Sequence, residues 1–366
     1  MNGIIIVIVV ATALAFDFTN GFHDTANVVA TSISTRAIGP RRAIVIASLL
    51  NFAGAFISLK VAATVGKGFV ATHAVTTNVV FAALVGAIGW NLITWYFGLP
   101  SSSSHALIGG LVGAVIAAQG FAAVNGHGLV SKLIVPAIVA PVVAFLTAGL
   151  GIVLIYRIVG RLRPGPVGRG FRLGQLASGG LLALSHGTND AQKTMGVITL
   201  ALIAHGDIAS HGFHVPLWVV ITAASAIAFG TFTGGWRIIK TMGTRIISMD
   251  PAQGFAAQGA GAAVILAASS VGYPLSTTHV ISGGITGAGA AKSFSAVRWG
   301  VAGDIVVAWV LTLPAAAVFA AATYGVTRLL GGGAAGPITI SIVLLAALAA
   351  VFARRLQQAA PAPSSR

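Results

Sequence analysis

Long runs of apolar residues constrain this chain more than any other feature. The stretches Gly3 to Phe16, Leu133 to Tyr156 and Ile338 to Phe352 contain no charged residue, and a lipid bilayer takes about 20 apolar residues per helix. Only 7% of the 366 residues are charged, whereas a soluble domain carries about 25%. This composition excludes a soluble globular protein and predicts an all-α polytopic membrane protein.

The polar segments between the apolar runs predict where the helices begin and end. The expected helices cover residues 3–34, 43–59, 77–97, 105–118, 133–156, 173–204, 215–235, 254–270, 279–291, 297–330 and 336–353. No Lys or Arg occurs in the first 35 residues, so we expect the first run to remain as a span rather than to be a cleaved signal peptide.

Positive charge orients these spans. With the N-terminus outside, most of the 21 Lys and Arg residues fall on the cytoplasmic side, as the positive-inside rule requires. Those residues are Arg36, Arg41, Arg42, Arg157, Arg161, Arg163, Arg169, Arg172, Arg237, Lys240, Arg245, Lys292, Arg298, Arg354, Arg355 and Arg366. Because they sit in short loops, the net charge of +15 does not indicate nucleic-acid binding.

Two motifs occur twice in the chain. Gly98 to Ala114 reads GLPSSSSHALIGGLVGA and Gly272 to Ala288 reads GYPLSTTHVISGGITGA, with eight identities in 17 aligned positions. The second pair is GFHDTAN at residues 21–27 and GTNDAQK at residues 187–193. Because both motifs recur in the same order, we interpret the chain as a duplication.

The expected orientation makes the two halves inverted in the membrane, with each Ser-rich motif in a broken or re-entrant helical hairpin. The polar segment GRLRPGPVGRG at residues 160–170 reads as a linker. We expect a first membrane repeat at 1–156, a cytoplasmic linker at 157–172, a second, inverted repeat at 173–330, and a C-terminal helix and tail at 331–366. Such repeats are typical of secondary transporters, whose sites lie near the midplane.

Asp24 and Asp190 lie inside apolar spans, where an ionised carboxylate is costly and indicates function. The structural alternative is an aspartate that pairs with a basic residue to hold helices together. Asn27 and Asn189 lie beside them, and carboxylate with amide oxygens suits a proton or a hard cation. His23 and Lys193 occupy the positions aligned with Asn189 and Asn27. Lys193 would neutralise an aspartate or attract an anion.

The hydroxyl residues of the other motif precede Gly-rich helices and have the form of helix N-caps. A helix N-terminus offers free N–H donors to a phosphate-like anion. Simple capping is the structural alternative, but one or two hydroxyls would satisfy it. The candidate anion-binding hydroxyls are Ser102, Ser103, Ser104, Ser276, Thr277 and Thr278.

Other ionisable groups have open roles. His105 and His279 follow the hydroxyls and would bind the anion, relay a proton or fix the turn. Asp17 and Asp304 lie in predicted spans and are either proton-relay groups or helix-pairing groups.

The motifs GFHDTAN, PSSSSH, SHGTNDAQKTMG and PLSTTH together resemble the inorganic phosphate transporter (Pit) family over nearly the whole chain. The resemblance implies phosphate symport in the cell inner (cytoplasmic) membrane by a protein that is not an enzyme. With His23 and Lys193 in place of Asn, the two motifs resemble those of the bacterial low-affinity branch. This resemblance implies coupling to protons and carriage of a divalent metal-phosphate complex. Asn27 and Asn189 would then join the hydroxyls in binding phosphate.

The expected partners are inorganic phosphate, the lipid bilayer and a second copy of the chain in a homodimer, without nucleic acid. No cofactor is expected. The coupled or carried ions are protons, a divalent metal held by Asp24 and Asp190, or sodium. Alternatives are a sodium-coupled phosphate symporter, a permease for sulfate or another tetrahedral oxyanion, and a hydrolase that uses Ser103 or Ser104 with His105.

Overall fold

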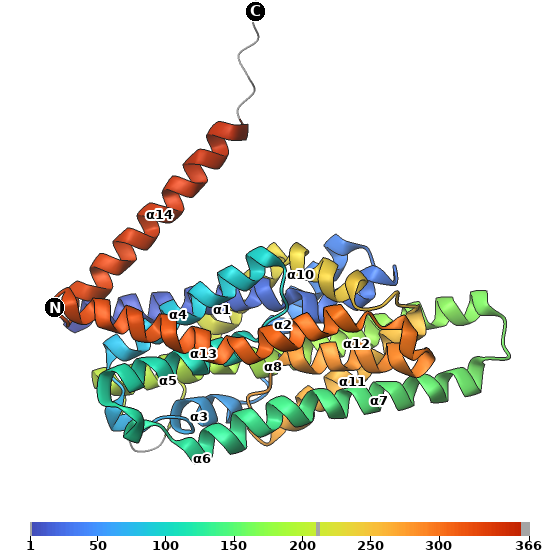
Figure 1. Ribbon diagram of the computed structural model, residues 1–366, viewed down its shortest axis with the longest axis horizontal. Helices are drawn as coiled ribbons and strands as arrows, with labels where there is room; N and C mark the ends of the chain where they lie inside the picture. The colour runs from blue at the N-terminus through green and yellow to red at the C-terminus, as the bar shows by residue number, and fades with distance from the viewer. Residues whose placement is uncertain (1, 210–212, 360–366) are drawn as a thin grey trace, which may run out of the picture.

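The computed structural model describes residues 2–209 and 213–359, and within these ranges it is built from helices without strands (Figure 1). The helices are α1 (Asn2–Ser34), α2 (Pro40–Gly54), α3 (Lys60–Lys67), α4 (Thr77–Phe97), α5 (Ser103–Gln119), α6 (Gly126–Leu129), α7 (Val135–Val159), α8 (Pro164–His205), α9 (Leu217–Thr233), α10 (Trp236–Lys240), α11 (Pro251–Ser270), α12 (Thr277–Lys292), α13 (Trp299–Leu329) and α14 (Ala335–Ala359). Short 3-10 or π turns are η1 (Thr72–Ala74), η2 (Phe121–Ala123), η3 (Val130–Ile134), η4 (Thr241–Arg245) and η5 (Phe294–Ala296). The predicted all-α class is confirmed.

The longest apolar helices identify an integral membrane protein. Within the described residues, four helical segments are long and apolar enough to cross a membrane. They are Gly3–Ser34, Thr77–Phe97, Gly126–Val159, which comprises α6, η3 and α7, and Trp299–Leu329. Helix α9 with its continuation through η4 makes a fifth if the pair, bent by 61°, is counted as one. Each predicted helix has a counterpart, whereas the short helices α3, α6 and α10 were not predicted.

The surface of α7 shows why this chain needs lipid. A stripe at four-residue spacing, comprising Ile138, Val142, Leu146, Leu150 and Leu154, is exposed along the helix. The opposite face buries Ala140, Ala144, Ala148 and Ile152. Large apolar side chains outside and small ones inside are the arrangement expected of a helix that packs against its neighbours in a membrane.

Glycines let the two short helices of the Ser-rich motifs pack closely against their neighbours. On α5, a Cβ at Gly109 or Gly113 would strike the backbone of α13 at Leu313 or Ala317. The same relationship recurs on α12. There, Gly283 and Gly287 face Pro141 and Phe145 of α7 in the same way. Each short helix is therefore locked against a long, Pro-containing helix.

The two halves of the sequence interleave rather than forming separate units. Helix α5 packs between α4 of its own half and α13 of the other half, and α12 packs between α11 of its own half and α7 of the other. Helix α1 likewise packs against α9, and α2 against α8. In Figure 1, α5 lies toward one end of the bundle and α12 toward the other.

The segment predicted as a linker is shorter than expected from its polarity. Helix α7 ends at Val159 and α8 begins at Pro164, so most of residues 157–172 is helical. Pro164 stands at the first turn of α8, where proline is favoured because its missing N–H has no partner to lose. Helix α14 projects away from the bundle after its first turns (Figure 1).

Candidate functional site

Two continuous helices carry the aspartate motifs into the middle of the protein. Asp24 lies in the second half of α1 and is 2% exposed, and Asp190 lies in the second half of α8 and is fully buried. Helices α1 and α8 pack against each other. The structure therefore brings the two predicted aspartates together, although they are 166 residues apart in the sequence.

The N-termini of α5 and α12 meet at the same place. Ser102 caps α5 by accepting a hydrogen bond from the backbone N–H of His105 at 3.1 Å. Ser276 caps α12 in the same way, by accepting from the backbone N–H of His279 at 3.3 Å. The imidazole rings of His105 and His279 are 4.7 Å apart. Both helix N-termini, with their positive dipole ends, thus face one central region.

Asn27 and Lys193 link each aspartate motif to the Ser-rich motif of the other half. The side-chain amide of Asn27 donates to Thr278 Oγ1 at 2.9 Å and to Thr277 Oγ1 at 3.3 Å. The ammonium of Lys193 donates to Ser104 Oγ at 2.5 Å and to the carbonyl of Leu275 at 2.7 Å. In the sequence alignment Asn27 pairs with Lys193, and Thr278 pairs with Ser104. The two contacts are therefore equivalent.

Each carboxylate has both a basic partner and a hydroxyl partner. Asp24 Oδ1 lies 2.7 Å from His23 Nδ1 and 3.5 Å from the hydroxyl of Thr278. Asp190 contacts the ammonium of Lys193 through Oδ1 and accepts from the hydroxyl of Thr277 at 3.2 Å through Oδ2. The motif residues that break the sequence symmetry, His23 and Lys193, thus supply basic partners to the aspartates.

His186 is a site residue that the sequence analysis missed. Its Nε2 lies 3.1 Å from Asp190 Oδ2, and its Nδ1 lies 3.2 Å from Asn51 Oδ1 of α2. Asp24, His186 and Asp190 each offer one ligand atom, and these three atoms lie within 4.8 Å of one another. The signal was present in the sequence, because residues four apart on a helix share a face.

Further hydrogen bonds extend the site toward α4 and α11. His23 Nε2 lies 3.1 Å from Thr94 Oγ1 and 3.3 Å from Ser101 Oγ. In the other half, Asn189 donates to Ser269 Oγ at 2.7 Å and to the carbonyl of Tyr273. Thr94 and Ser269 were not predicted as site residues.

Several polar atoms in this region have no hydrogen-bond partner in the described chain, and three of them lie on residues predicted to bind phosphate. They are Ser103 Oγ, Asn27 Oδ1 and Asn189 Oδ1, and all three side chains are buried. Ser103 is a donor, whereas the amide oxygens are acceptors. A buried polar atom without a partner is costly, so these atoms are free to bind a ligand that can both accept and donate.

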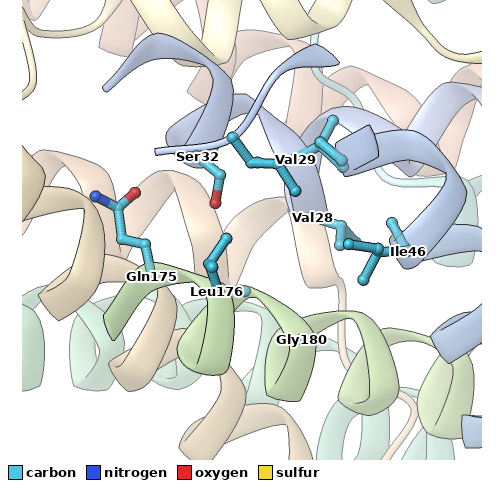
Figure 2. A pocket seen from close by; sticks show the side chains of 11 residues that line it. Val28, Val29, Ser32, Ile46, Gln175, Leu176 and Gly180 are labelled. Atoms are coloured by element: carbon cyan, nitrogen blue, oxygen red, sulfur yellow. The ribbon is translucent and has the colours of Figure 1, made fainter. Parts of the chain in front are cut away.

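The site is closed off from the surface. Its predicted side chains are all buried, and a cavity beside the same part of α1 has a different lining. That cavity, of about 130 Å³, lies between α1, α2 and α8 and is lined mainly by apolar side chains such as Val28 and Leu176, with Ser32 and Gln175 at its polar end (Figure 2). The structure therefore shows an occluded central site.

The comparison with protein families decides the identity. A model of the phosphate transporter family matches residues 20–320. The chain belongs to the phosphate transporter family. The predicted resemblance is thus confirmed, and a role as an enzyme is excluded because the family and its members are transporters.

Relatives of this family member bear the same kind of name. A Mycobacterium bovis protein named "Probable low-affinity inorganic phosphate transporter" is 53% identical over 328 residues, which cover 90% of this chain and 79% of that protein. A Bacillus subtilis protein of the same name is 44% identical and covers 89% of this chain and 98% of its own length. A solved structure titled "The sodium-dependent phosphate transporter" superposes with a TM-score of 0.81 at 25% identity, over 89% of this chain and 99% of that one.

Proposed function

We propose that this phosphate transporter imports inorganic phosphate through one site shared by two inverted repeats, in symport with protons. The observation that carries the proposal is the pair of equivalent contacts, Asn27 with Thr278 and Lys193 with Ser104. Each contact joins an aspartate motif to the Ser-rich motif of the other half. A shared site of this kind needs both halves, which fits a duplicated chain.

The chemistry of the shared site suits phosphate. Ser102 and Ser276 accept a backbone N–H as caps, so their own O–H groups remain free to donate to an anion, as does the hydroxyl of Ser103. The helix N-termini and Lys193 add positive charge. Monohydrogen phosphate can also donate a hydrogen bond to the free oxygens of Asn27 and Asn189, whereas sulfate cannot.

Alternating access follows from the inverted arrangement. Helices α5 and α12 point their N-termini at the same centre from opposite ends of the bundle. Under the charge-based topology, with the N-terminus outside, α5 with its preceding segment forms the outer hairpin and α12 forms the inner one. Rocking of one half against the other would then open the occluded site to one side at a time.

Proton coupling is supported by the basic side chains already present in the site. The ammonium of Lys193 contacts Asp190 and already supplies a single positive charge there, so no sodium ion is needed to neutralise this carboxylate. His23 holds Asp24 in a similar way. Sodium coupling is the second candidate, because the superposed structure is titled as sodium-dependent.

A divalent metal could enter with the phosphate as part of the cargo. Asp24, His186 and Asp190 offer two carboxylate oxygens and one imidazole nitrogen around one point. Such mixed ligands suit first-row divalent metals, and oxygen ligands also suit magnesium. The metal would be released with phosphate and would not be a resident cofactor.

Uptake of radiolabelled phosphate into proteoliposomes tests this function. Proton gradient, sodium and divalent metal are varied one at a time. We expect an inward proton gradient to drive accumulation without sodium, and a divalent metal to increase it. Accumulation that required sodium and ignored the proton gradient would contradict proton symport. The homodimer stays a prediction, which light scattering of the purified protein in detergent would test.

A further inference from the structure

Asp17 on α1 differs from the other acidic residues of the chain. It is fully buried, and neither of its carboxylate oxygens has a hydrogen-bond partner among the described residues. Asp24, Asp190, Asp207 and Asp250 each lie beside a basic side chain, and Asp304 is exposed on α13. A buried carboxylate without a counter-charge costs several kcal/mol or more if it is ionised.

The side chains nearest to Asp17 are polar but uncharged. Asn20 lies one turn along α1, and Thr194 faces the carboxylate from α8. Asn20 Oδ1 and Thr194 Oγ1 also lack hydrogen-bond partners within the described chain. The Asp17 carboxylate, the amide oxygen of Asn20 and the hydroxyl of Thr194 therefore gather in one buried place, and a proton on Asp17 would supply a donor to the amide oxygen.

Few ionisable groups act on Asp17. Asp190 and Lys193, both on α8, are the charged groups that interact with it. Helix α9, which packs against the same part of α1 at Phe18 and Gly21, has no ionisable side chain. Among the other neighbours of α1, α4 has only Tyr96, in its last turn, α2 has arginines in its first turn, and α11 and the part of α14 through residue 347 have no ionisable side chain. The ionisable side chains of α5, α10, η4 and α12 do not act on Asp17; they are His105, Arg237, Lys240, Arg245, His279 and Lys292.

The position of Asp17 relates it to the central site. Asp17 and Asp24 are seven residues apart on one continuous helix, so they lie on nearly the same face and about 10 Å apart along the axis. Asp17 lies on the N-terminal side of the central site, which the charge distribution places toward the outside. A proton that enters from outside would reach Asp17 before the phosphate site.

We propose that Asp17 is the carboxylate that binds and releases the transported proton. The inference rests on the proposed proton symport and assigns its coupling group. A proton from outside water forms an O–H bond on the carboxylate, and that bond breaks when the proton leaves to the cytoplasmic water. Protonated Asp17 leaves the ammonium of Lys193 to Asp190 and Ser104, whereas ionised Asp17 competes for it.

Charge links the proton to the anion. A phosphate at the central site adds negative charge near Asp17 and makes its ionised form less favourable. By thermodynamic reciprocity, a proton on Asp17 then strengthens phosphate binding by the same factor. Proton and phosphate therefore occupy the protein together, which is the requirement for symport.

The test compares Asp17→Asn with wild type in proteoliposomes, and uses Asp304→Asn as the matched control on an exposed face. Three readouts are needed: exchange of labelled phosphate at equal concentrations, accumulation driven by a pH gradient, and proton entry followed by an internal dye. A gradient of one pH unit supports about tenfold accumulation per coupled proton. We expect Asp17→Asn to keep exchange but to lose accumulation and proton entry, whereas Asp304→Asn keeps all three.

The outcomes separate this inference from the proposed function. If wild type ignores the proton gradient, the proposed symport is wrong. If wild type responds and Asp17→Asn accumulates phosphate equally well, Asp17 is not the coupling group. Accumulation driven by sodium in wild type and lost in Asp17→Asn would make the oxygen cluster a sodium site and overturn the proton assignment.

Asp17→Glu covers the case in which Asp17→Asn loses even exchange. Glutamate restores a titratable carboxylate, so we expect proton-driven uptake to return with a changed pH profile. A correctly inserted Asp17→Glu protein that exchanges phosphate without moving protons would contradict the inference.

Discussion

Asn27 of α1 and Thr278 of α12, which are 251 residues apart in the sequence, share a hydrogen bond of 2.9 Å. The aligned pair makes the equivalent contact, with Lys193 on α8 of the second half and Ser104 on α5 of the first half. Since an amide stands at one position and an ammonium at the other, the two sides of the site have similar geometry but different charge. In the proposed phosphate site, Lys193 would then place a fixed positive charge on one side only.

Removal of charge from either central aspartate should stop transport while the protein still inserts. Asp24→Asn keeps hydrogen bonding but removes the charge paired with His23, and Asp190→Asn removes the charge paired with Lys193. Loss of one charge-assisted hydrogen bond costs about 1.5–3 kcal/mol, so uptake should fall at least about tenfold. Phosphate uptake, normalised to membrane-inserted protein, measures this. Near-normal uptake in both variants would reduce the aspartates to a helix-pairing role.

Topology can be measured with single cysteines, because the chain has none of its own. Gly165→Cys lies in the exposed first turn of α8, and Phe121→Cys replaces a side chain that is 79% exposed in η2. The charge distribution predicts that an impermeant thiol reagent labels Phe121→Cys from outside and Gly165→Cys from the cytoplasm. Labelling of both from one side would contradict the inverted repeats.

A methyl group at Gly113 should disturb the contact between α5 and α13. The added Cβ would strike the backbone at Ala317, which cannot move away as a flexible side chain could. Overpacking of this kind costs about 1–3 kcal/mol, so Gly113→Ala should lower the Tm of the purified protein. Gly303→Ala on α13 is the control, since its Cβ meets no atom. Equal Tm values for the two variants would show that the close approach is unimportant.

Asp250 should make stability depend on pH. It caps α11 by accepting from the N–H of Gln253 at 2.9 Å, and it contacts Tyr156 and Lys292 at 2.6 and 3.0 Å. Burial raises the pKa of this carboxyl, but the hydrogen bonds from Tyr156, Gln253 and Lys292 outweigh it and lower the pKa below 3.8. Because the folded-state pKa is lowered, the stabilisation is complete above the unfolded value and is lost as pH falls through the folded value.

The variant Asp250→Ala measures this contribution. At neutral pH the lost cap should cost about 1 kcal/mol, seen as a lower Tm in detergent. The difference in Tm between wild type and Asp250→Ala should shrink as the pH falls below about 4. A gap that stays constant down to pH 3 would show that the carboxylate charge contributes nothing.

The helices and motifs were readable from the sequence because they depend on local patterns. Hydropathy predicted the long spans, and the repeated motifs predicted which segments would converge. Short helices such as α3 were missed because the segment between Lys60 and Lys67, its two ends, contains too few apolar residues to give a periodic signal. The start of α8 was missed because its glycines and prolines resemble a loop.

Partners across helices could not be predicted in the same way. Thr94 contacts His23, and Asn51 contacts His186, over 71 and 135 residues of sequence. Such pairs depend on how α4 and α2 pack against the motif helices, which no local pattern encodes. The lack of a partner at Asp17 was equally invisible, since its environment comes from α8.

Equilibrium binding of labelled phosphate to the purified protein tests the shared site most directly. Ser103→Ala removes the unpartnered hydroxyl of one half. Thr277→Val removes the aligned hydroxyl of the other half, whose O–H donates to Asp190 in this structure and would turn to the phosphate when it binds. If one phosphate is held by both, the wild type binds one phosphate per chain. Each substitution should then weaken binding about 10- to 100-fold, with sulfate a poor competitor. Two phosphates per chain, an unchanged affinity in either variant, or equal displacement by sulfate would contradict the account.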